Sequence, residues 1–385
     1  MDDIKKFNGD RLKSARIYRG LNVAELAEKL NLQRQTVSMY ENDKSKPSVE
    51  NIKKMSKELK FPVSFFLETD LLKIKEGSTY FRSLLTTSKK YRNQQIQKIH
   101  LLGQIYAFLE EYIDFRPLRL PNVENLSIED AALELRSCWD LEEKPVENIV
   151  YLAEQNGLLV TSFESEQDNI DAFSQLIDIN NEAKYLIGFS LNKGTAARIH
   201  FDIAHEIGHI LLHEWSEDIE TLSKDEFIER ENEAHSFASA FLLPKDAFLR
   251  DISTYADNIP YYIELKKKWK VSISAMIRRS YNLRIIDYNT YQRLMRTMQK
   301  KGIRKEEPLD KILITAKPSL LKTAVQMLLN EGVFTPKEFV NELANQYGLS
   351  ILPSEIELLL DLPKDTLKID NVIPFHSLNL KSTSN

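Results

Sequence analysis

Residues 201–213 read FDIAHEIGHILLH, and the interpretation of the whole chain depends on this stretch. His205 and His209 are four positions apart, so on a helix both imidazole rings project from one face. Zn²⁺ binds imidazole nitrogens at about 2.0–2.1 Å, and this spacing lets two histidines reach one ion. Glu206 lies beside the pair, where it can take a proton from an attacking water and pass it to a leaving amine. The competing interpretation is a chance pair of histidines on a buried helix.

A catalytic zinc site needs a third protein ligand and an open fourth position. The candidates lie in ERENEAHSFASAFLLP, residues 229–244, where Glu231 and Glu233 are the carboxylates near the start of a predicted helix. Small residues at Ala234 and Ala238 would let this helix pack tightly against the histidine-bearing one, and Gly208 leaves room for a close backbone approach. This second helix favours the metal site over the chance pair.

Three β-like runs precede the motif: LLVTSF, DAFSQLID and AKYLIGFS, separated by polar turns. We expect them to form a small antiparallel sheet, with an exposed strand edge that can hold an extended peptide over the metal. Helices are predicted on both sides of these strands, including a long amphipathic helix over residues 88–113. The stretch EGSTYFRS, residues 76–83, breaks the helical pattern and is predicted to be a linker. The long helix can form a dimer seam or pack on the body, and packing is the default.

The two histidine and glutamate motifs together resemble the ImmA/IrrE family of gluzincin-like metallo-endopeptidases. The resemblance covers roughly residues 120–308 and ends in a helical extension with the closing stretch KKGIRKEEP. It implies that His205, His209 and Glu231 are the ligands of one Zn²⁺ per chain and that Glu206 is the general base. Glu231 is preferred to Glu233 because the family glutamate lies thirteen residues before the proline of the LLP end, here Pro244.

One position departs from the family pattern. Four residues after the ligand glutamate the family commonly has Asn or Asp, which orients a histidine ligand, whereas this chain has His235. His235 can either orient a ligand or contact the metal itself. His213, one turn beyond His209, is more typical of a histidine satisfied at a helix end than of a ligand.

The first 70 residues predict five short helices with a net charge of +3, on a chain whose total net charge is −5. Two of these helices, joined by a tight turn in NVAELAEKLNLQRQTVSMYEN, suit reading of the DNA major groove. The head resembles the Cro/C1-type (XRE) helix-turn-helix over residues 11–67, with Val23 where that family often has a phosphate-contacting Gln. The residues expected to contact bases and phosphates are Gln33, Arg34, Gln35, Thr36, Ser38 and Lys44.

Composition sets further bounds. The chain has 385 residues, enough for two or three domains with real cores. No stretch approaches the roughly 18 apolar residues of a membrane span, and the start MDDIKKFNGD lacks the apolar segment of a signal peptide. Cys138 is the single cysteine, so no internal disulfide or cysteine-based metal cluster can form. We expect a cytoplasmic protein without a membrane partner.

These observations predict a mainly α, α+β chain in four parts. Residues 1–70 form a helix-turn-helix DNA-binding domain and residues 71–120 a linker and long helix. Residues 121–308 form an ImmA/IrrE-like zinc metallopeptidase domain, and residues 309–385 a helical C-terminal region with a flexible tail. That last region can cover the active site, bind a partner or complete the core.

The resemblance implies a zinc-dependent endopeptidase that binds DNA and cleaves a helix-turn-helix repressor, or itself, to control transcription in a stress or mobile-element response. A homodimer would double its DNA contacts. The alternative is an XRE-family transcriptional regulator that uses an inactive or weakly active peptidase-like domain as a sensor. A third, weaker interpretation is a zinc hydrolase that does not act on peptides.

Overall fold

The computed structural model describes residues 6–69, 75–81, 89–163, 172–179, 182–191, 194–215 and 222–369. The N-terminal head is helical, as expected. Its elements are α1 (Gly9–Tyr18), α2 (Val23–Leu30), α3 (Arg34–Glu41), α4 (Val49–Leu59) and the 3₁₀ helix η1 (Val63–Leu67). Asn22 and Ser48 cap α2 and α4 by accepting backbone N–H groups. The predicted five-helix head is therefore confirmed, with a 3₁₀ turn as its fifth member.

The body is built around one four-stranded sheet. Its strands are β1 (Lys75–Phe81), β2 (Leu159–Phe163), β3 (Ala172–Ile179) and β4 (Glu182–Ser190), in the spatial order β1-β3-β4-β2. β3 pairs antiparallel with β1 and β4, whereas β2 pairs parallel with β4. The sheet is thus mixed, and the prediction of an antiparallel sheet was wrong for β2. The reason is that β2 pairs with the second strand of the β3–β4 hairpin rather than with its neighbour in sequence.

β1 is the second difference from the sequence-based expectation. It occupies most of the stretch predicted to be a linker and pairs with the outer edge of β3, with Tyr80 opposite Ser174 and Phe81 opposite Phe173. The β-forming run Thr79–Tyr80–Phe81 is compatible with a strand, but only the unpaired edge of β3 gives it a partner. The edge of β3 is therefore covered by the chain itself.

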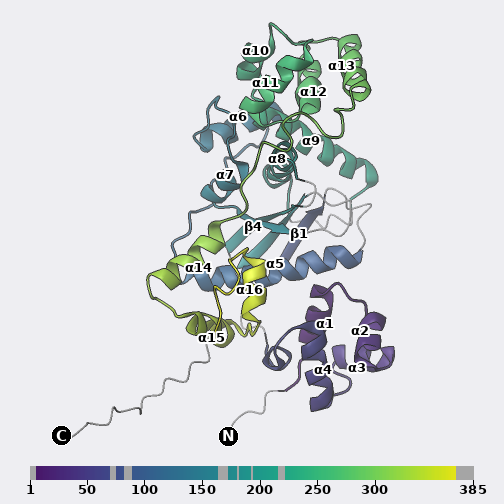
Figure 1. The fold of residues 1–385 in the computed structure, drawn as a ribbon, viewed down its shortest axis with the longest axis vertical. Helices are drawn as coiled ribbons and strands as arrows, with labels where there is room; N and C mark the ends of the chain where they lie inside the picture. Colours follow the sequence, from purple (N-terminus) through teal and green to yellow (C-terminus); the bar gives the residue numbers. More distant parts are fainter. Residues whose placement is uncertain are drawn as a thin grey trace, which may run out of the picture.

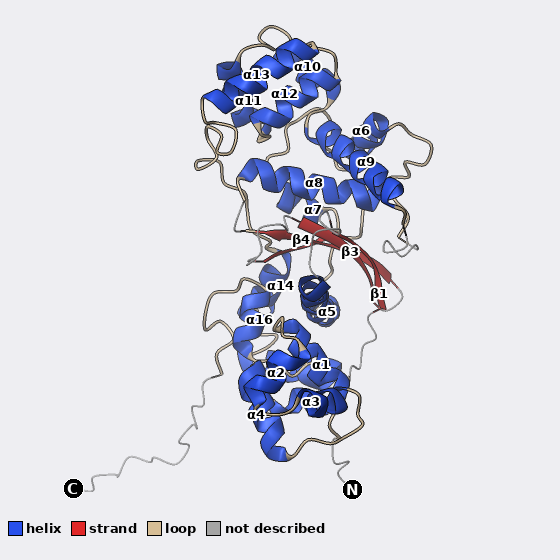
Figure 2. Cartoon of the chain, turned by 90° about the vertical axis from the view of Figure 1, so that its right-hand side faces the viewer, coloured by secondary structure: helices blue, strands red, loops and turns tan. Residues whose placement is uncertain are grey.

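The sheet separates two apolar cores. Alternate residues of β3 point to opposite faces, so Phe173 and Ile177 join the core that contains the head, while Ala172 joins the other. α5 (Lys89–Glu110) covers the first face and α8 (Ala196–Leu212) the second (Figure 2). Residues 101–109 of α5 are all buried, so the long helix packs within the body rather than presenting a dimer seam.

The second core contains the remaining helices of the body. They are α6 (Ile128–Cys138), α7 (Ile149–Gln155), α9 (Lys224–Leu242), α10 (Lys245–Ile252), α11 (Ile259–Trp269), α12 (Ile273–Asn282) and α13 (Tyr288–Lys300). Asn148 caps α7 by accepting the backbone N–H of Tyr151. α10 to α13 form the end of the molecule farthest from the head (Figure 1). None of the described helices is long and apolar enough to cross a membrane.

The closing stretch GIRKEEP has a structural role. Glu307 accepts hydrogen bonds from the backbone N–H groups of Ile273 and Ser274 and so satisfies the first turn of α12. The same carboxylate lies 2.8 Å from the fully buried ammonium of Lys266, which also contacts Asp310 at 2.6 Å. This buried pairing fixes residues 307–310 against α11 and α12.

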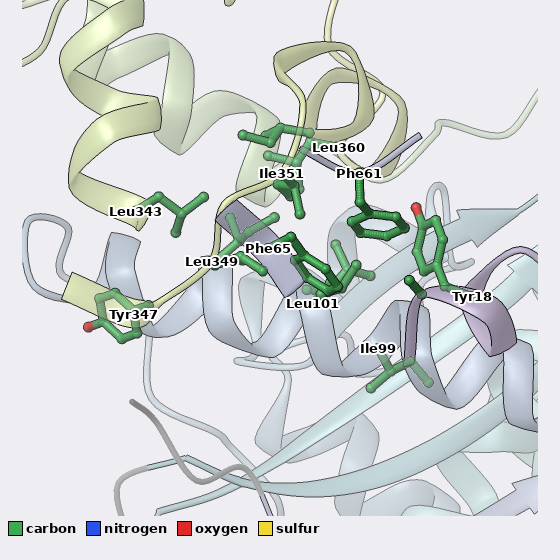
Figure 3. Close-up of a cluster of buried hydrophobic side chains, with 14 of the residues drawn as sticks. Tyr18, Phe61, Phe65, Ile99, Leu101, Leu343, Tyr347, Leu349, Ile351 and Leu360 are labelled. Carbon is green, nitrogen blue, oxygen red and sulfur yellow. The ribbon is translucent and has the colours of Figure 1, made fainter. Parts of the chain in front are cut away.

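The C-terminal region completes the core of the head side. Its helices are α14 (Leu320–Asn330), α15 (Pro336–Tyr347) and α16 (Pro353–Leu359), and α14 starts ten residues later than expected. Phe108 of α5 meets the rings of Phe339 and Tyr347 at centroid distances of 5.3 and 5.9 Å. Figure 3 shows Phe61 and Phe65 of the head, Leu101 of α5 and residues of the C-terminal region in one cluster. The predicted flexible tail lies outside the described residues.

Polar contacts also join the head to the C-terminal region. Arg19 lies 2.7 Å from Glu355, and the hydroxyl of Tyr18 donates to the same carboxylate at 2.5 Å. Ser350 donates its hydroxyl to Glu68 at 2.6 Å. Because these side chains are mostly buried, the pairs are shielded from water and salt. The head is thus docked on α5 and on the C-terminal helices.

Candidate functional site

The two histidines of the opening motif lie on α8, deep between the sheet and α9. His205, Glu206 and His209 are all fully buried. Thr195 caps the helix by accepting the N–H of Arg198, and the apolar residues of α8 anchor it in the second core. A Cβ on Gly208 would lie 3.2 Å from the Cα of Ala234, so the missing side chain is what allows α9 to approach this closely. The close approach of the two helices brings α9 residues next to the histidines.

Three donor groups converge between α8 and α9. The Nε2 atoms of His205 and His209 are 3.1 Å apart, and the carboxylate of Glu231 lies 3.4 Å from the first and 3.1 Å from the second. Ligand atoms around a tetrahedral zinc ion with bonds of about 2.0–2.1 Å are separated by about 3.3–3.4 Å. The nitrogen and oxygen donors therefore fit a zinc ion both in chemistry and in spacing.

The protonation of these groups also suits a cation. Burial lowers the pKa of His205 well below its ordinary value, although its hydrogen bond with Glu231 opposes the shift. Burial alone would raise the pKa of Glu231, but hydrogen bonds and charges from His205 and His209 outweigh it and hold that pKa well below its usual range. A neutral imidazole and an ionised carboxylate are the forms that bind metal.

His235 faces the same space. Its Nδ1 lies 2.8 Å from the carbonyl oxygen of Glu231, and since a carbonyl can only accept, Nδ1 carries a proton and donates it. The ring centroids of His235 and His205 are 4.5 Å apart. Donor atoms of His205, Glu231 and His235 all lie within 4.8 Å of one another. His235 is thus placed as a candidate donor beside His209, and both alternatives that the sequence left for it stay open.

Glu233 takes a different partner from Glu231. Its carboxylate lies 3.1 Å from Nε2 of His213, whose Nδ1 lies 3.0 Å from Nδ1 of His209. Burial lowers the pKa of His213 to about 3, with the charge of His209 adding to the effect. His213 and Glu233 therefore lie behind His209, on the side away from Glu231, where they can orient its ring.

Ser174 is a site residue that the sequence did not reveal. It lies on β3, faces α8, and donates its hydroxyl to Glu206 at 2.5 Å. The only hint in the sequence was a serine within the apolar run DAFSQLID. The strand alone does not tell which helix this serine faces. This hydrogen bond fixes the direction of the carboxylate that the motif places beside the histidines.

The residues expected to contact DNA lie on α3 or close to its two ends. Gln33 is the residue before α3, and Arg34, Gln35 and Ser38 lie on α3; all four are exposed, as is Lys44 in the following loop. Thr36 is half-buried. α3 follows α2 after a turn with Asn31 in the left-handed conformation, so the pair forms a helix-turn-helix. In both views this pair of helices lies at the end of the molecule away from the sheet (Figures 1 and 2).

Fold and site together define a helix-turn-helix head joined to a domain with a His-Glu-x-x-His helix. Comparison with protein families agrees with this description. Residues 12–66 match the helix-turn-helix family model, and residues 153–281 match the model of the IrrE N-terminal-like domain, a peptidase family. No curated protein matches the chain significantly. The chain therefore joins an XRE-type helix-turn-helix domain to an IrrE N-terminal-like domain, which confirms the fusion that the sequence resemblance predicted.

Proposed function

We propose that the chain is a zinc-dependent endopeptidase with its own DNA-binding head. The observation that carries the proposal is the convergence of His205, His209 and Glu231 at 3.1–3.4 Å, with Glu206 held by Ser174 beside them. His205 and Glu231 would hold the ion together with His209, and His235 is the alternative or additional donor. When bound, zinc supplies a Lewis acid that polarises the scissile carbonyl and makes water more acidic.

The residues of the chain supply the remaining steps. Glu206 accepts the proton of the attacking water and gives it to the nitrogen of the departing amine. The hydroxyl of Ser174 keeps one carboxylate oxygen of Glu206 in place. Burial of the site excludes bulk water, which strengthens each of these interactions.

The proposed substrate is a transcriptional repressor of the helix-turn-helix type, or the chain itself. The support is that the matched head is a DNA-binding type, so the peptidase is held where repressors act. Cleavage there would release a controlled promoter in a stress or mobile-element response. An extended peptide would pair with β3, the strand that carries Ser174, in the place that β1 occupies in this structure.

The second candidate function is a transcriptional regulator whose peptidase-like domain acts mainly as a sensor. One observation favours it: β1 of the same chain occupies the edge of β3. A peptide would have to displace β1 before it could pair beside Glu206. Low activity of the isolated chain would follow directly from this arrangement.

The metal centre is tested by zinc content and by cleavage of a helix-turn-helix repressor. We expect one zinc per chain in the wild type, loss of zinc in His205→Ala, and full zinc without cleavage in Glu206→Gln. Glu231→Gln and Glu233→Gln form a matched pair on one helix, and only the first should lose zinc. His209→Ala and His235→Ala show which histidine completes the ligand set.

The outcomes separate the candidates. Zinc uptake without cleavage of any repressor or of the chain would favour the sensor. A chain that takes up no zinc at micromolar supply would overturn the peptidase.

The DNA contacts are tested by selection from a pool of random duplexes. Gln35→Ala should relax sequence preference, because its amide is expected to bond a base edge. Lys44→Met should weaken binding to all sequences and reduce the salt dependence, because the lysine is expected to contact phosphate. Lys267→Met, an exposed lysine on α11, is the control and should change neither property. No retained sequence and no dependence on salt would contradict DNA binding by the head.

A further inference from the structure

A cavity of about 260 Å³ lies on the opposite side of the sheet from the metal centre. Its walls come from Tyr18 of the head, residues 95–102 of α5, residues 160–163 of β2, Phe173 of β3, Leu191, and residues 317–322 and 358–361 of the C-terminal region. Its volume is near the lower end of small-molecule pockets, which run from about 300 to 1,000 Å³. The cavity is separate from the proposed zinc ligands, none of which lines it.

The lining of the cavity is mixed, with buried apolar side chains beside polar groups. Ile99, Leu102 and Phe163 are buried and line it. Gln95 also lines it, is 2% exposed, and its amide nitrogen has no hydrogen-bond partner among the described residues. A buried donor without a partner costs about 1–3 kcal/mol, so such groups are usually satisfied by a ligand or a water. The amide of Gln95 would reach an occupant only after its side chain rotates, because the nitrogen itself has no accessible surface in the structure.

Two lysines and one carboxylate lie together in the lining of the cavity. They are Lys317, Lys322 and Asp361, and Asp361 is the only carboxylate among the lining residues. Lys317 lies 3.0 Å from the carboxylate of Asp361, and Lys322 donates to its backbone carbonyl at 2.8 Å and lies 3.8 Å from its carboxylate. Two ammonium groups thus share one carboxylate. An anion at this place would complete their hydrogen bonding, and charge-assisted bonds are the stronger kind.

We propose that this cavity binds a small organic anion with an apolar body. The carboxylate or phosphate of the ligand would meet Lys317 and Lys322, and the apolar body would lie against Ile99 and Leu102. Head, sheet, α5 and C-terminal helices would all contact one ligand. Occupancy therefore stabilises the docking of the head, to which Tyr18 contributes through its bond with Glu355.

The test uses the full chain with octanoate, 2-naphthoate and octyl phosphate as probes and 1-octanol as the uncharged match to octanoate. Calorimetry should give one site per chain for at least one anion, with affinity at least about tenfold above that for 1-octanol. The same anion should raise the melting temperature. Lys322→Met should weaken anion binding at least about tenfold and leave 1-octanol binding unchanged.

Two further variants make the test specific. Leu102→Trp fills the cavity and should abolish binding, provided that its unfolding stays cooperative; if it does not, Lys322→Met and Lys317→Met decide. Lys54→Met is the control, since Lys54 is an exposed lysine paired with Glu50 and distant from the lining residues. Its affinity for the anion should equal that of the wild type.

Three results would overturn the proposal. The first is no binding of any of the three anions. The second is equal affinity for octanoate and 1-octanol, which would leave an apolar cavity without anion recognition. The third is binding that appears only in a chain truncated after residue 369, which would assign the cavity to the C-terminal segment of the protein. None of these results depends on peptidase activity, so the zinc measurements remain an independent test of the proposed function.

Discussion

Ser174 and Glu206 come from different elements and meet at 2.5 Å in the interior of the body. On the proposed mechanism Ser174 is a positioning residue, because it acts on the substrate only through the carboxylate it holds. The partner of Glu206 therefore matters for turnover and not for metal binding. His200 lies on the same helix and is also a buried titratable group. Unlike Glu206, its side chain has no hydrogen-bond partner among the described residues.

Ser174→Ala should lower kcat/KM for the cleaved repressor by about tenfold, because Glu206 loses the hydrogen bond that directs it. Zinc content should stay at the wild-type value, as Ser174 is not among the donor groups. Ser174→Thr keeps a hydroxyl and should recover part of the loss. A Ser174→Ala chain with unchanged kcat/KM would show that the hydrogen bond does not orient the base.

His200 is fully buried, and burial, assisted by the charge of Lys270, lowers its pKa from 6.5 to about 4. As the pH falls, His200 therefore takes up a proton near pH 6.5 in the unfolded chain but only near pH 4 in the folded chain. The free energy of unfolding should fall by about 3 kcal/mol between these two values through this group. His200→Leu should remove that fall, because leucine does not titrate.

The measurement is chemical unfolding of both chains at a series of pH values, with chelator present so that metal release does not contribute. A variant whose unfolding free energy depends on pH as steeply as the wild type would show that His200 is not buried in its neutral form.

At the scale of elements, the position of β1 is the most consequential feature. It belongs to neither of the matched domains, yet it completes the sheet at the edge nearest Ser174. The backbone of β3 can pair with only one extended chain on this side. β1 and a peptide substrate would therefore compete for β3.

Replacing residues 75–81 by seven Gly and Ser residues should raise cleavage of an external repressor several-fold at unchanged zinc content. The replacement keeps the connection between head and body but has little tendency to form a strand. The measurement is the initial rate of repressor cleavage, with zinc determined on the same samples. Unchanged or lower activity would mean that the substrate does not use the β3 edge.

At the scale of the whole molecule, the C-terminal region belongs to the same core as the head. α14 and α15 pack on α5, residues of α16 belong to the same core, and residues of α1 bond to Gly348 and Glu355. Of the three roles that the sequence left open for this region, completion of the core is the one its contacts support. The helix-turn-helix is thus held by elements from both ends of the chain.

Truncation after residue 308 should remove cooperative unfolding of the head and cause aggregation, because it exposes the apolar surfaces of α5 and of Phe61 and Phe65. Truncation after residue 369 is the matched control, since it keeps α14 to α16, and it should unfold like the full chain. Both are compared by calorimetry and size-exclusion chromatography. A soluble, cooperatively folded chain of residues 1–308 would contradict the shared core.

The sequence by itself determined the local features. The i, i+4 spacing of His205 and His209 and the helix-turn-helix pattern depend on residues close together in the chain. The positions of β2, β3 and β4 were predicted correctly, because each depends on the residues of its own short segment. Such features follow from helix and strand periodicity and from the orphan N–H groups of a first turn.

Only the tertiary structure decided which side chains and strands contact each other across the fold. It directs Glu231 toward the histidine pair and Glu233 toward His213, brings Ser174 to Glu206, and turns the presumed linker into β1. It also makes β2 parallel to β4 and joins the head to the C-terminal helices. These outcomes depend on packing between segments distant in sequence, which neither spacing nor propensity within one segment encodes.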